Sequence, residues 1–218
     1  MKKDDDKRCK HRQAGMTRRG FITSLGAGAV GVAASGSLLS EGAKASELEE
    51  FKAADTLSKL RLHVNGRPYH LLVEPRWSLL FALREKLGFN GTKIGCERGE
   101  CGACTILLDG VPRYACQTLA LEAEGHEITT IEGLMEGEEL GPVQQAFLDE
   151  DAYQCGYCTP GQIMAAEGLL RANPDPSDEE ILTGMSGNYC RCAAYRNIFQ
   201  AVKSASTKGL GQGRGGQS

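Results

Sequence analysis

The stretch Cys96-Glu-Arg-Gly-Glu-Cys101-Gly-Ala-Cys104 decides how this chain folds, because it places three cysteines in one short loop. A fourth cysteine, Cys116, follows after eleven intervening residues. Thiolates at this C-x4-C-x2-C…C spacing are typical of a [2Fe–2S] site, in which the loop curls around the cluster and points backbone N–H groups at it. Gly95, Gly99 and Gly102 would let the backbone approach closely and take positive φ. We call these four cysteines the first cysteine set.

Other roles are open to clustered cysteines, but the spacing does not favour them here. Structural zinc usually takes C-x2–4-C pairs, and an overlapping C-x4-C and C-x2-C fits that pattern poorly. A disulfide framework would require partners elsewhere for Cys101 and Cys104, and nothing in the spacing supplies them. Inert buried cysteines would not be expected to gather in a Gly-rich loop.

The composition is that of a globular protein with an unusual cysteine content. The 218 residues are 41% hydrophobic and 24% charged, and eight of the nine cysteines fall into two groups of four. Cys9 stands alone and receives no role. The net charge of −3 is uneven, because residues 1–45 carry nine Lys and Arg against four Asp and Glu. The remaining chain is therefore strongly acidic, which argues against nucleic-acid binding.

Residues 1–45 have the organisation of an export signal. A basic stretch ends in Arg18-Arg19-Gly-Phe-Ile, an apolar Gly/Ala-rich run extends to Leu39, and Ala43-Lys-Ala45 offers a cleavage site. The arginine pair makes this segment resemble a twin-arginine signal, with a plain signal or a membrane anchor as alternatives. The glycines keep the run too weakly hydrophobic to favour a membrane span.

This route would export the protein folded, which a metal cluster assembled beforehand requires. We therefore expect a periplasmic protein with no stable membrane anchor after signal cleavage. Thiolates already bound to iron would not pair as disulfides in that oxidising compartment.

After a polar linker at 46–56, residues 57–133 have the pattern of a small domain with a sheet. Leu60, Leu62 and Val64 alternate with charged residues, and Asn65-Gly66 then favours a tight hairpin. We expect strands at 57–64 and 69–73, a helix at 78–87 capped by Ser78, strands at 105–108 and at Cys116, and a closing strand at 128–131. This order resembles the β-grasp fold of plant-type ferredoxins. We call this region the ferredoxin-type domain.

Residues 141–207 change to helical periodicity, and we call them the helical domain. Helices are predicted from Pro142, at 161–172, from the capping box Ser177-Asp-Glu-Glu180 to about Met185, and at 194–204. The fold class is thus α+β, a β-grasp domain followed by a small four-helix bundle. The tail at 208–218, with five glycines, is expected to be disordered.

The helical domain carries a second cysteine set: Cys155, Cys158, Cys190 and Cys192. Each pair lies in a turn just before a predicted helix, where unpaired N–H groups favour an anionic group. Four thiolates at two such turns could bind a second [2Fe–2S] cluster. Zinc stays open here, because C-x2-C with a further cysteine pair is also zinc spacing. A redox disulfide is less favoured, since no βαβ pattern surrounds the motif.

Two longer motifs make a family resemblance specific. Residues 154–162, Gln-Cys-Gly-Tyr-Cys-Thr-Pro-Gly-Gln, and residues 185–192, Met-Ser-Gly-Asn-Tyr-Cys-Arg-Cys, accompany the first cysteine set. Together they resemble the iron–sulfur subunit of the xanthine oxidase/aldehyde oxidoreductase family of molybdenum hydroxylases, over about residues 57–205. With the export signal, the similarity is greatest to the small subunits of periplasmic aldehyde oxidoreductases.

The resemblance implies an electron-transfer subunit rather than a substrate-binding one. A molybdenum cofactor, molybdopterin cytosine dinucleotide, would hydroxylate the substrate on a large subunit. Electrons would pass to a [2Fe–2S] cluster on the second cysteine set, then to one on the first, then to FAD on a medium subunit or to another acceptor. Gln154 would contact the pterin, and Cys192 would lie on the pterin side of its cluster.

The chain itself offers no substrate chemistry. No G-x-G-x-x-G fingerprint follows a predicted strand, and Gly26-Ala-Gly28 belongs to the signal. The reactive cofactors are therefore expected on partner subunits. The main alternative is a free-standing periplasmic carrier with two clusters, and a third is a zinc-stabilised interaction module. An obligate subunit, unlike a carrier, should expose an apolar face on its helical domain.

Overall fold

The computed structural model describes residues 57–135 and 137–207. The predicted signal, the linker and the C-terminal tail lie outside these residues, as does Cys9, so those expectations stay predictions. The ferredoxin-type domain and the helical domain belong to the same compact unit. Within the described ranges, no helix has the length and apolar character needed to span a membrane.

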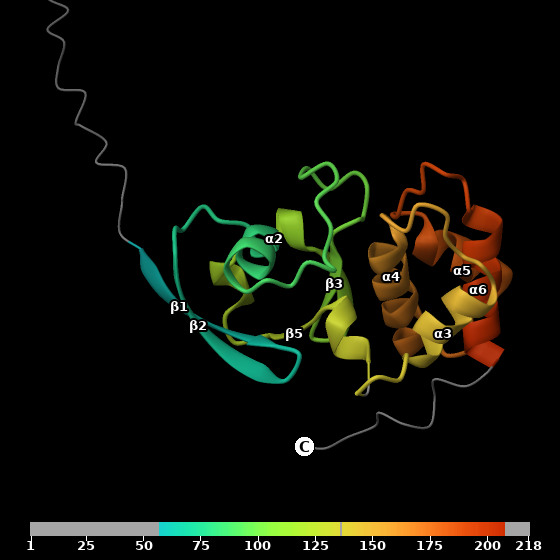
Figure 1. The fold of residues 1–218 in the computed structure, drawn as a ribbon, viewed down its shortest axis with the longest axis horizontal. Helices are drawn as coiled ribbons and strands as arrows, with labels where there is room; N and C mark the ends of the chain where they lie inside the picture. The colour runs from blue at the N-terminus through green and yellow to red at the C-terminus, as the bar shows by residue number, and fades with distance from the viewer. Residues whose placement is uncertain (1–56, 136, 208–218) are drawn as a thin grey trace, which may run out of the picture. The chain divides into compact units, whose positions relative to one another are not determined.

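The ferredoxin-type domain is built on a mixed five-stranded sheet in the order β2-β1-β5-β3-β4 (Figure 1). Its strands are β1 (Ser58–Val64), β2 (Arg67–Val73), β3 (Thr105–Leu108), β4 (Val111–Tyr114) and β5 (Glu127–Thr129). Strand β1 pairs in parallel with β5, and the other neighbours are antiparallel. The predicted hairpin is confirmed: Asn65 and Gly66 both have positive φ, as a two-residue turn of type I′ requires.

The predicted helix after Ser78 is present, but its second half is irregular. Helix α2 (Leu79–Phe81) is capped by the Ser78 hydroxyl, which accepts a hydrogen bond from the N–H of Phe81 at 3.2 Å. The helix continues as a π-helical turn, Ala82–Lys86, and Leu87 bonds back to the carbonyl of Ala82. Leu79, Leu80 and Leu83 are buried in the domain core, and the partly buried Leu87 packs against it.

Two expected strands have to be corrected. Cys116 does not lie on a strand, because β4 ends at Tyr114 and Cys116 follows in a 3₁₀ turn, Ala115–Gln117. That turn brings the chain back to the cysteine loop, where the N–H of Ala115 bonds to the carbonyl of Cys104. The closing strand ends at Thr129, because the N–H of Thr130 bonds to the side chain of Asn65 instead of extending the ladder.

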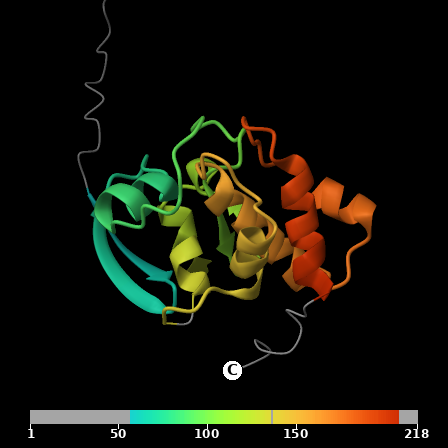
Figure 2. The same cartoon turned by 45° about the vertical axis from the view of Figure 1, so that its right-hand side comes forward.

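The helical domain contains α3 (Pro142–Asp149), α4 (Thr159–Ala172), α5 (Asp178–Met185) and α6 (Tyr195–Thr207). Figure 1 labels these helices, and Figure 2 draws them from another side in yellow to red. Pro142 opens α3, and the capping box of Ser177 and Glu180 opens α5, as predicted. Helix α4 starts two residues earlier than predicted, and α6 starts one residue later and extends to Thr207. The mixed α+β class is confirmed, whereas a regular four-helix bundle stays a prediction.

Each domain has its own cluster of buried apolar side chains, and β3 contributes to both. Ile106 packs into the core of the ferredoxin-type domain, whereas its neighbour Leu107 packs into that of the helical domain. Helix α4 approaches the sheet closely at Gly168, where a Cβ atom would lie 2.2 Å from Pro112 Cγ. Strand β3 is therefore covered on both faces, as strands between two layers are.

Candidate iron–sulfur centres

The first cysteine set is assembled from two separate segments. Cys96, Cys101 and Cys104 lie in the loop between α2 and β3, and Cys116 comes from the turn after β4. The thiol of Cys101 lies close enough to Cys96 to affect its pKa, and the thiol of Cys116 lies close enough to affect the pKa of Cys104. The structure thus brings together the four side chains that the spacing singled out.

Backbone N–H groups in the loop point at sulfur, as expected. The N–H groups of Arg98 and Glu100 donate to Cys96 Sγ, with N···S distances of 3.5 and 3.3 Å. Burial alone would raise the pKa of Cys96, but these hydrogen bonds outweigh it and lower the pKa to about 7. Amides placed in this way stabilise negative charge on sulfur, whether of a thiolate or of a cluster.

Cys104 has the opposite environment. Burial in the domain core, reinforced by the neighbouring Cys116 and Cys101, raises the pKa of the Cys104 thiol to about 12. A lone thiolate is therefore unfavourable at this position. Iron bound at the thiolates would supply the missing positive charge, because metal binding replaces the thiol proton.

The loop glycines have two different uses. Gly99 and Gly102 take positive φ, at 81° and 68°, as the sequence predicted. Gly95 does not; it is needed because a Cβ atom there would lie 2.7 Å from Cys101 Sγ. Its missing side chain leaves space beside the sulfur, which fits a site that has to accommodate a bulky inorganic group.

The second cysteine set lies at the start of two helices. Cys158 is the N-cap residue of α4, and Cys190 and Cys192 lie in the turn before α6. The thiols of Cys155 and Cys192 are in contact, and so are those of Cys158 and Cys190. The four thiols therefore converge from both turns, next to the partial positive charge at a helix N-terminus.

The second set repeats the electrostatics of the first. The N–H of Ala194 donates to Cys190 Sγ at 3.4 Å. Burial, together with the neighbouring Cys190, raises the pKa of Cys158 to about 12, whereas the N–H of Tyr157 lowers the pKa of the exposed Cys155. Each set thus combines an exposed or amide-stabilised thiol with a buried one.

The donor chemistry fits iron–sulfur clusters at both positions. All eight cysteines are free thiols, and soft sulfur ligands of this kind favour iron–sulfur clusters or zinc. A cavity of about 430 Å³ lies between the two sets, with Cys101 on one side and Cys155, Cys158 and Cys190 on the other. In the part of the chain that the structure describes, no group of three or more His, Cys, Asp or Glu side chains is arranged to hold a single metal ion. A [2Fe–2S] cluster does not require that arrangement, because its four thiolates bind two irons and need not converge on one point. Gln154 is exposed next to Cys155, where a partner could reach it.

Sequence reasoning missed the residues that join the two cysteine loops. The hydroxyl of Tyr157 donates to the carbonyl of Ile94, just before the first cysteine set. The hydroxyl of Tyr114 donates to the carbonyl of Gly187 at 2.8 Å, just before the second pair of the other set. Asn188 adds further bonds, described below. Tyr157 and Asn188 lie near cysteines in the quoted motifs, and only that position could have drawn attention to them, whereas Tyr114 lies outside those motifs.

Comparison with known proteins places both regions in iron–sulfur families. Residues 62–128 match the family described as the 2Fe-2S iron-sulfur cluster binding domain, and residues 130–203 match the [2Fe-2S] binding domain. The nicotinate dehydrogenase small FeS subunit of Eubacterium barkeri is 47% identical over 146 residues, covering 67% of this chain and 93% of that protein. The aldehyde oxidoreductase iron-sulfur-binding subunit PaoA of Escherichia coli (strain K12) is 44% identical, with 70% and 73% covered.

Solved structures agree with these matches. Quinoline 2-oxidoreductase from Pseudomonas putida 86 matches with a TM-score of 0.67 and 47% identity, covering 70% of this chain and 95% of that chain. The aldehyde oxidoreductase from Desulfovibrio desulfuricans ATCC 27774 matches with a TM-score of 0.67 and 39% identity, over 70% of this chain but only 17% of that longer chain. The chain therefore belongs to the small iron–sulfur subunits of the xanthine oxidase family of molybdenum hydroxylases, and is an electron-transfer subunit with two [2Fe–2S]-binding domains.

Proposed function

We propose that this chain is the iron–sulfur subunit of an exported molybdenum hydroxylase, with one [2Fe–2S] cluster on each cysteine set. The observation that carries this proposal is the convergence of four thiols within each set, in two loops that lie against each other. When bound, the clusters supply one-electron redox chemistry. The chain's residues hold the sulfurs, direct N–H groups at them and bury part of each set away from water.

The surface of the helical domain supports a role as a subunit rather than as a free carrier. Tyr153, Tyr157, Tyr189 and Tyr195 are between 41% and 59% exposed, and they lie in or next to the cysteine turns. Leu182, on the neighbouring helix α5, is 63% exposed. Exposed tyrosines gathered around a redox site are typical of a surface that a partner covers. We propose that the large molybdenum subunit binds here and that Gln154 contacts its pterin.

The proposed relay runs from the large subunit to the second cysteine set and then to the first. From there electrons would pass to FAD on a medium subunit or to another acceptor. The substrate site would lie on the large subunit, since relatives are named for aldehydes as well as for nicotinate and quinoline. An aldehyde is the proposed substrate class, because an exported iron–sulfur subunit of this family resembles those of the periplasmic aldehyde oxidoreductases.

Metal analysis tests the cluster assignment. The purified protein should contain two irons and two acid-labile sulfides per cysteine set, and reduction should give two distinct S = 1/2 signals in electron paramagnetic resonance. Stoichiometric zinc, or half the expected iron with a single signal, would show that the second cysteine set holds another group. A colourless protein would contradict the proposal altogether.

The predicted twin-arginine signal is tested by location. Replacing Arg18 and Arg19 together with lysine keeps the charge but removes the arginine pair that the export route reads. The subunit and its partners should then stay in the cytoplasm and be active in lysates, as cell fractionation would measure. Replacing Arg8 and Arg12 with lysine is the matched control and should leave export unchanged. Normal export of the first variant would rule out the twin-arginine signal.

A further inference from the structure

The two cysteine loops are joined directly by a main-chain hydrogen bond. Tyr189, which precedes Cys190, donates its backbone N–H to the backbone carbonyl of Cys101, with an N···O distance of 3.0 Å. Cys101 belongs to the first cysteine set and Cys190 to the second. A path of covalent bonds interrupted by one hydrogen bond therefore leads from a sulfur of one set to a sulfur of the other.

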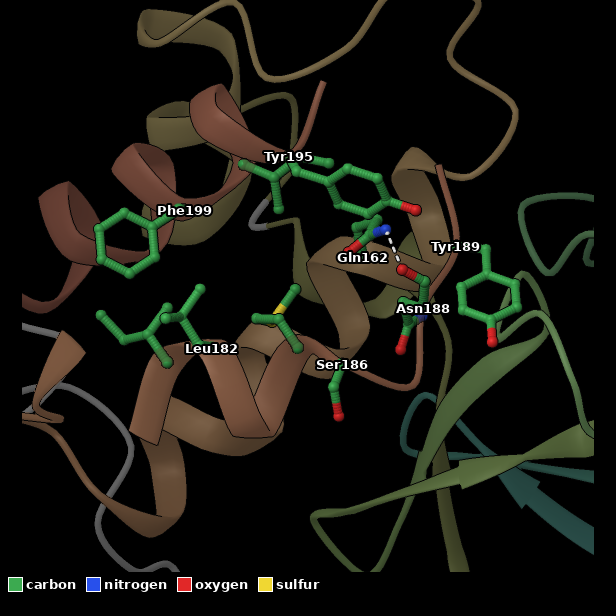
Figure 3. Close-up of a pocket in the computed structure, with 10 residues that line it drawn as sticks. Gln162, Leu182, Ser186, Asn188, Tyr189, Tyr195 and Phe199 are labelled. Carbon is green, nitrogen blue, oxygen red and sulfur yellow. Dashed lines mark hydrogen bonds between the residues drawn. The ribbon is translucent and has the colours of Figure 1, made fainter. Parts of the chain in front are cut away.

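Asn188, the residue before Tyr189, is bound to both domains. Its side-chain amide donates to the carbonyl of Gly102 at 2.9 Å and to Thr105 Oγ1 at 3.2 Å, both in the ferredoxin-type domain. Its main-chain carbonyl accepts a hydrogen bond from the side chain of Gln162 on α4 at 2.9 Å (Figure 3). Asn188 and Gln162 are only 4% and 1% exposed. The backbone that presents the Tyr189 N–H is thus fixed from both sides.

The residue before Asn188 is held as well. Gly187 accepts a hydrogen bond from Tyr114, and a Cβ atom at Gly187 would lie 2.2 Å from the Tyr114 hydroxyl oxygen. Gly187, Asn188 and Tyr189 therefore each bind the ferredoxin-type domain; we call this segment the seam. Most of these bonds are shielded from water, so they are stronger than exposed ones and costly to leave unmade.

We propose that Asn188 is a positioning residue for electron passage between the two iron–sulfur centres. It holds the hydrogen bond from the Tyr189 N–H to the Cys101 carbonyl in place. An electron can then pass from one centre to the other along covalent bonds and this one hydrogen bond, without a jump through space. One electron leaves one centre, which is oxidised, and enters the other, which is reduced. No bond of the chain forms or breaks, and no proton has to move. The inference rests on the proposed function, because it requires a cluster on each cysteine set.

The test compares three variants of the assembled enzyme. Asn188→Ala removes the amide bonds to Gly102 and Thr105, and Gly102 keeps a hydrogen bond from the Thr105 hydroxyl. Tyr114→Phe removes the hydroxyl that donates to the seam at the carbonyl of Gly187. Asn197→Ala is the control, because Asn197 also donates to two main-chain carbonyls, those of Glu150 and Asp151, but within the helical domain.

Two readouts report the bridge independently of turnover. The magnetic interaction between the two reduced centres, measured by paramagnetic resonance, depends on their separation and relative placement. Redistribution of one electron between the centres after flash photoreduction with deazaflavin gives the transfer rate. Asn188→Ala should keep both signals, weaken or broaden their interaction and slow redistribution several-fold. Tyr114→Phe should change both readouts in the same direction by less, and Asn197→Ala should match the wild type.

The outcomes separate this inference from the proposed function. Unchanged interaction and unchanged rate in Asn188→Ala, with both signals present, would overturn the role of Asn188. If the Asn188→Ala protein loses one of its two centres, the Tyr114→Phe variant provides the test instead. Slower electron redistribution between the centres in Tyr114→Phe would support the role of the seam, and a wild-type rate would overturn it. A wild-type protein with only one centre would instead contradict the proposed function.

Discussion

Gly102 is one of the residues at which the two domains approach each other closely around the cysteines. Its φ of +68° is in the left-handed region. A Cβ atom there would lie 2.6 Å from the carbonyl oxygen of Gly187 and 2.6 Å from Asn188 Cγ. Gly110, in the β3–β4 turn, has a similar φ of +79° but no atom within 4 Å of a Cβ position. These two glycines therefore separate backbone strain from steric contact.

We expect Gly102→Ala to destabilise the protein more than Gly110→Ala. Both changes impose the left-handed penalty, about 1–2 kcal/mol for a residue with a Cβ atom. Only Gly102→Ala also pushes the seam away from the cysteine loop, so its thermal midpoint should fall further. Differential scanning calorimetry of both variants measures the difference. Equal thermal midpoints of the two variants would mean that the domains can move apart at Gly102 without a loss of stability.

At the scale of the element, the start of α5 shows how much a local sequence can determine. The Ser177 hydroxyl accepts a hydrogen bond from the N–H of Glu180 at 3.3 Å. The Glu180 carboxylate in turn accepts from the N–H and hydroxyl of Ser177, at 2.7 and 2.8 Å. These bonds lower the pKa of Glu180. The cap therefore stabilises the fold above the ordinary carboxyl pKa and loses this contribution as the pH falls through the lowered value.

Removing this cap should weaken the helical domain. Ser177→Ala leaves the N–H of Glu180 without its side-chain acceptor, and the loss of such a cap typically costs about 1 kcal/mol. Ser206→Ala is the control, because that hydroxyl only donates to a carbonyl within α6 and alanine favours a helix. Denaturant unfolding should show a lower midpoint for Ser177→Ala alone, with the difference shrinking in acid. If Ser177→Ala and Ser206→Ala change the unfolding midpoint equally, the Ser177 cap does not contribute to the stability of the protein.

Such local signals explain which elements the sequence predicted well. Alternating leucines predicted β1, Asn65-Gly66 predicted its hairpin, and Ser177 with Glu180 predicted α5, because each depends on neighbours in the chain. The strand expected at Cys116 was wrong, since the turn there is formed by packing against a distant loop. The burial of β3 on both faces and the hydrogen bonds of Asn188 could not be predicted from the sequence either, because they depend on contacts between residues far apart in the chain.

At the scale of the whole molecule, the separate cores should allow one substitution to remove one centre and leave the other intact. Cys116→Ser should remove the signal of the first cysteine set and leave that of the second, because most residues around each set belong to one domain. Cys192→Ser is the matched change and should have the reverse effect. Paramagnetic resonance and iron content measure both. Rapid mixing of the Cys116→Ser enzyme with substrate should also show slowed flavin reduction if the proposed order is right.

The outcome that would contradict this assignment is equally clear. If Cys116→Ser removes both signals while the chain stays folded by circular dichroism, the cysteine sets do not hold independent centres. If flavin is still reduced at the wild-type rate without the first centre, the proposed order of the relay is wrong.

Strand β3 separates the two hydrophobic cores and contributes side chains to both. Ile106 packs into the core of the ferredoxin-type domain and Leu107 into that of the helical domain. Removing either domain would therefore expose the face of β3 that it covers. A shortened chain carrying a single centre would expose an apolar face and tend to aggregate. The match to the longer aldehyde oxidoreductase chain of Desulfovibrio desulfuricans ATCC 27774 covers 17% of that chain. The two domains, and the cysteine set in each, thus form one structural unit.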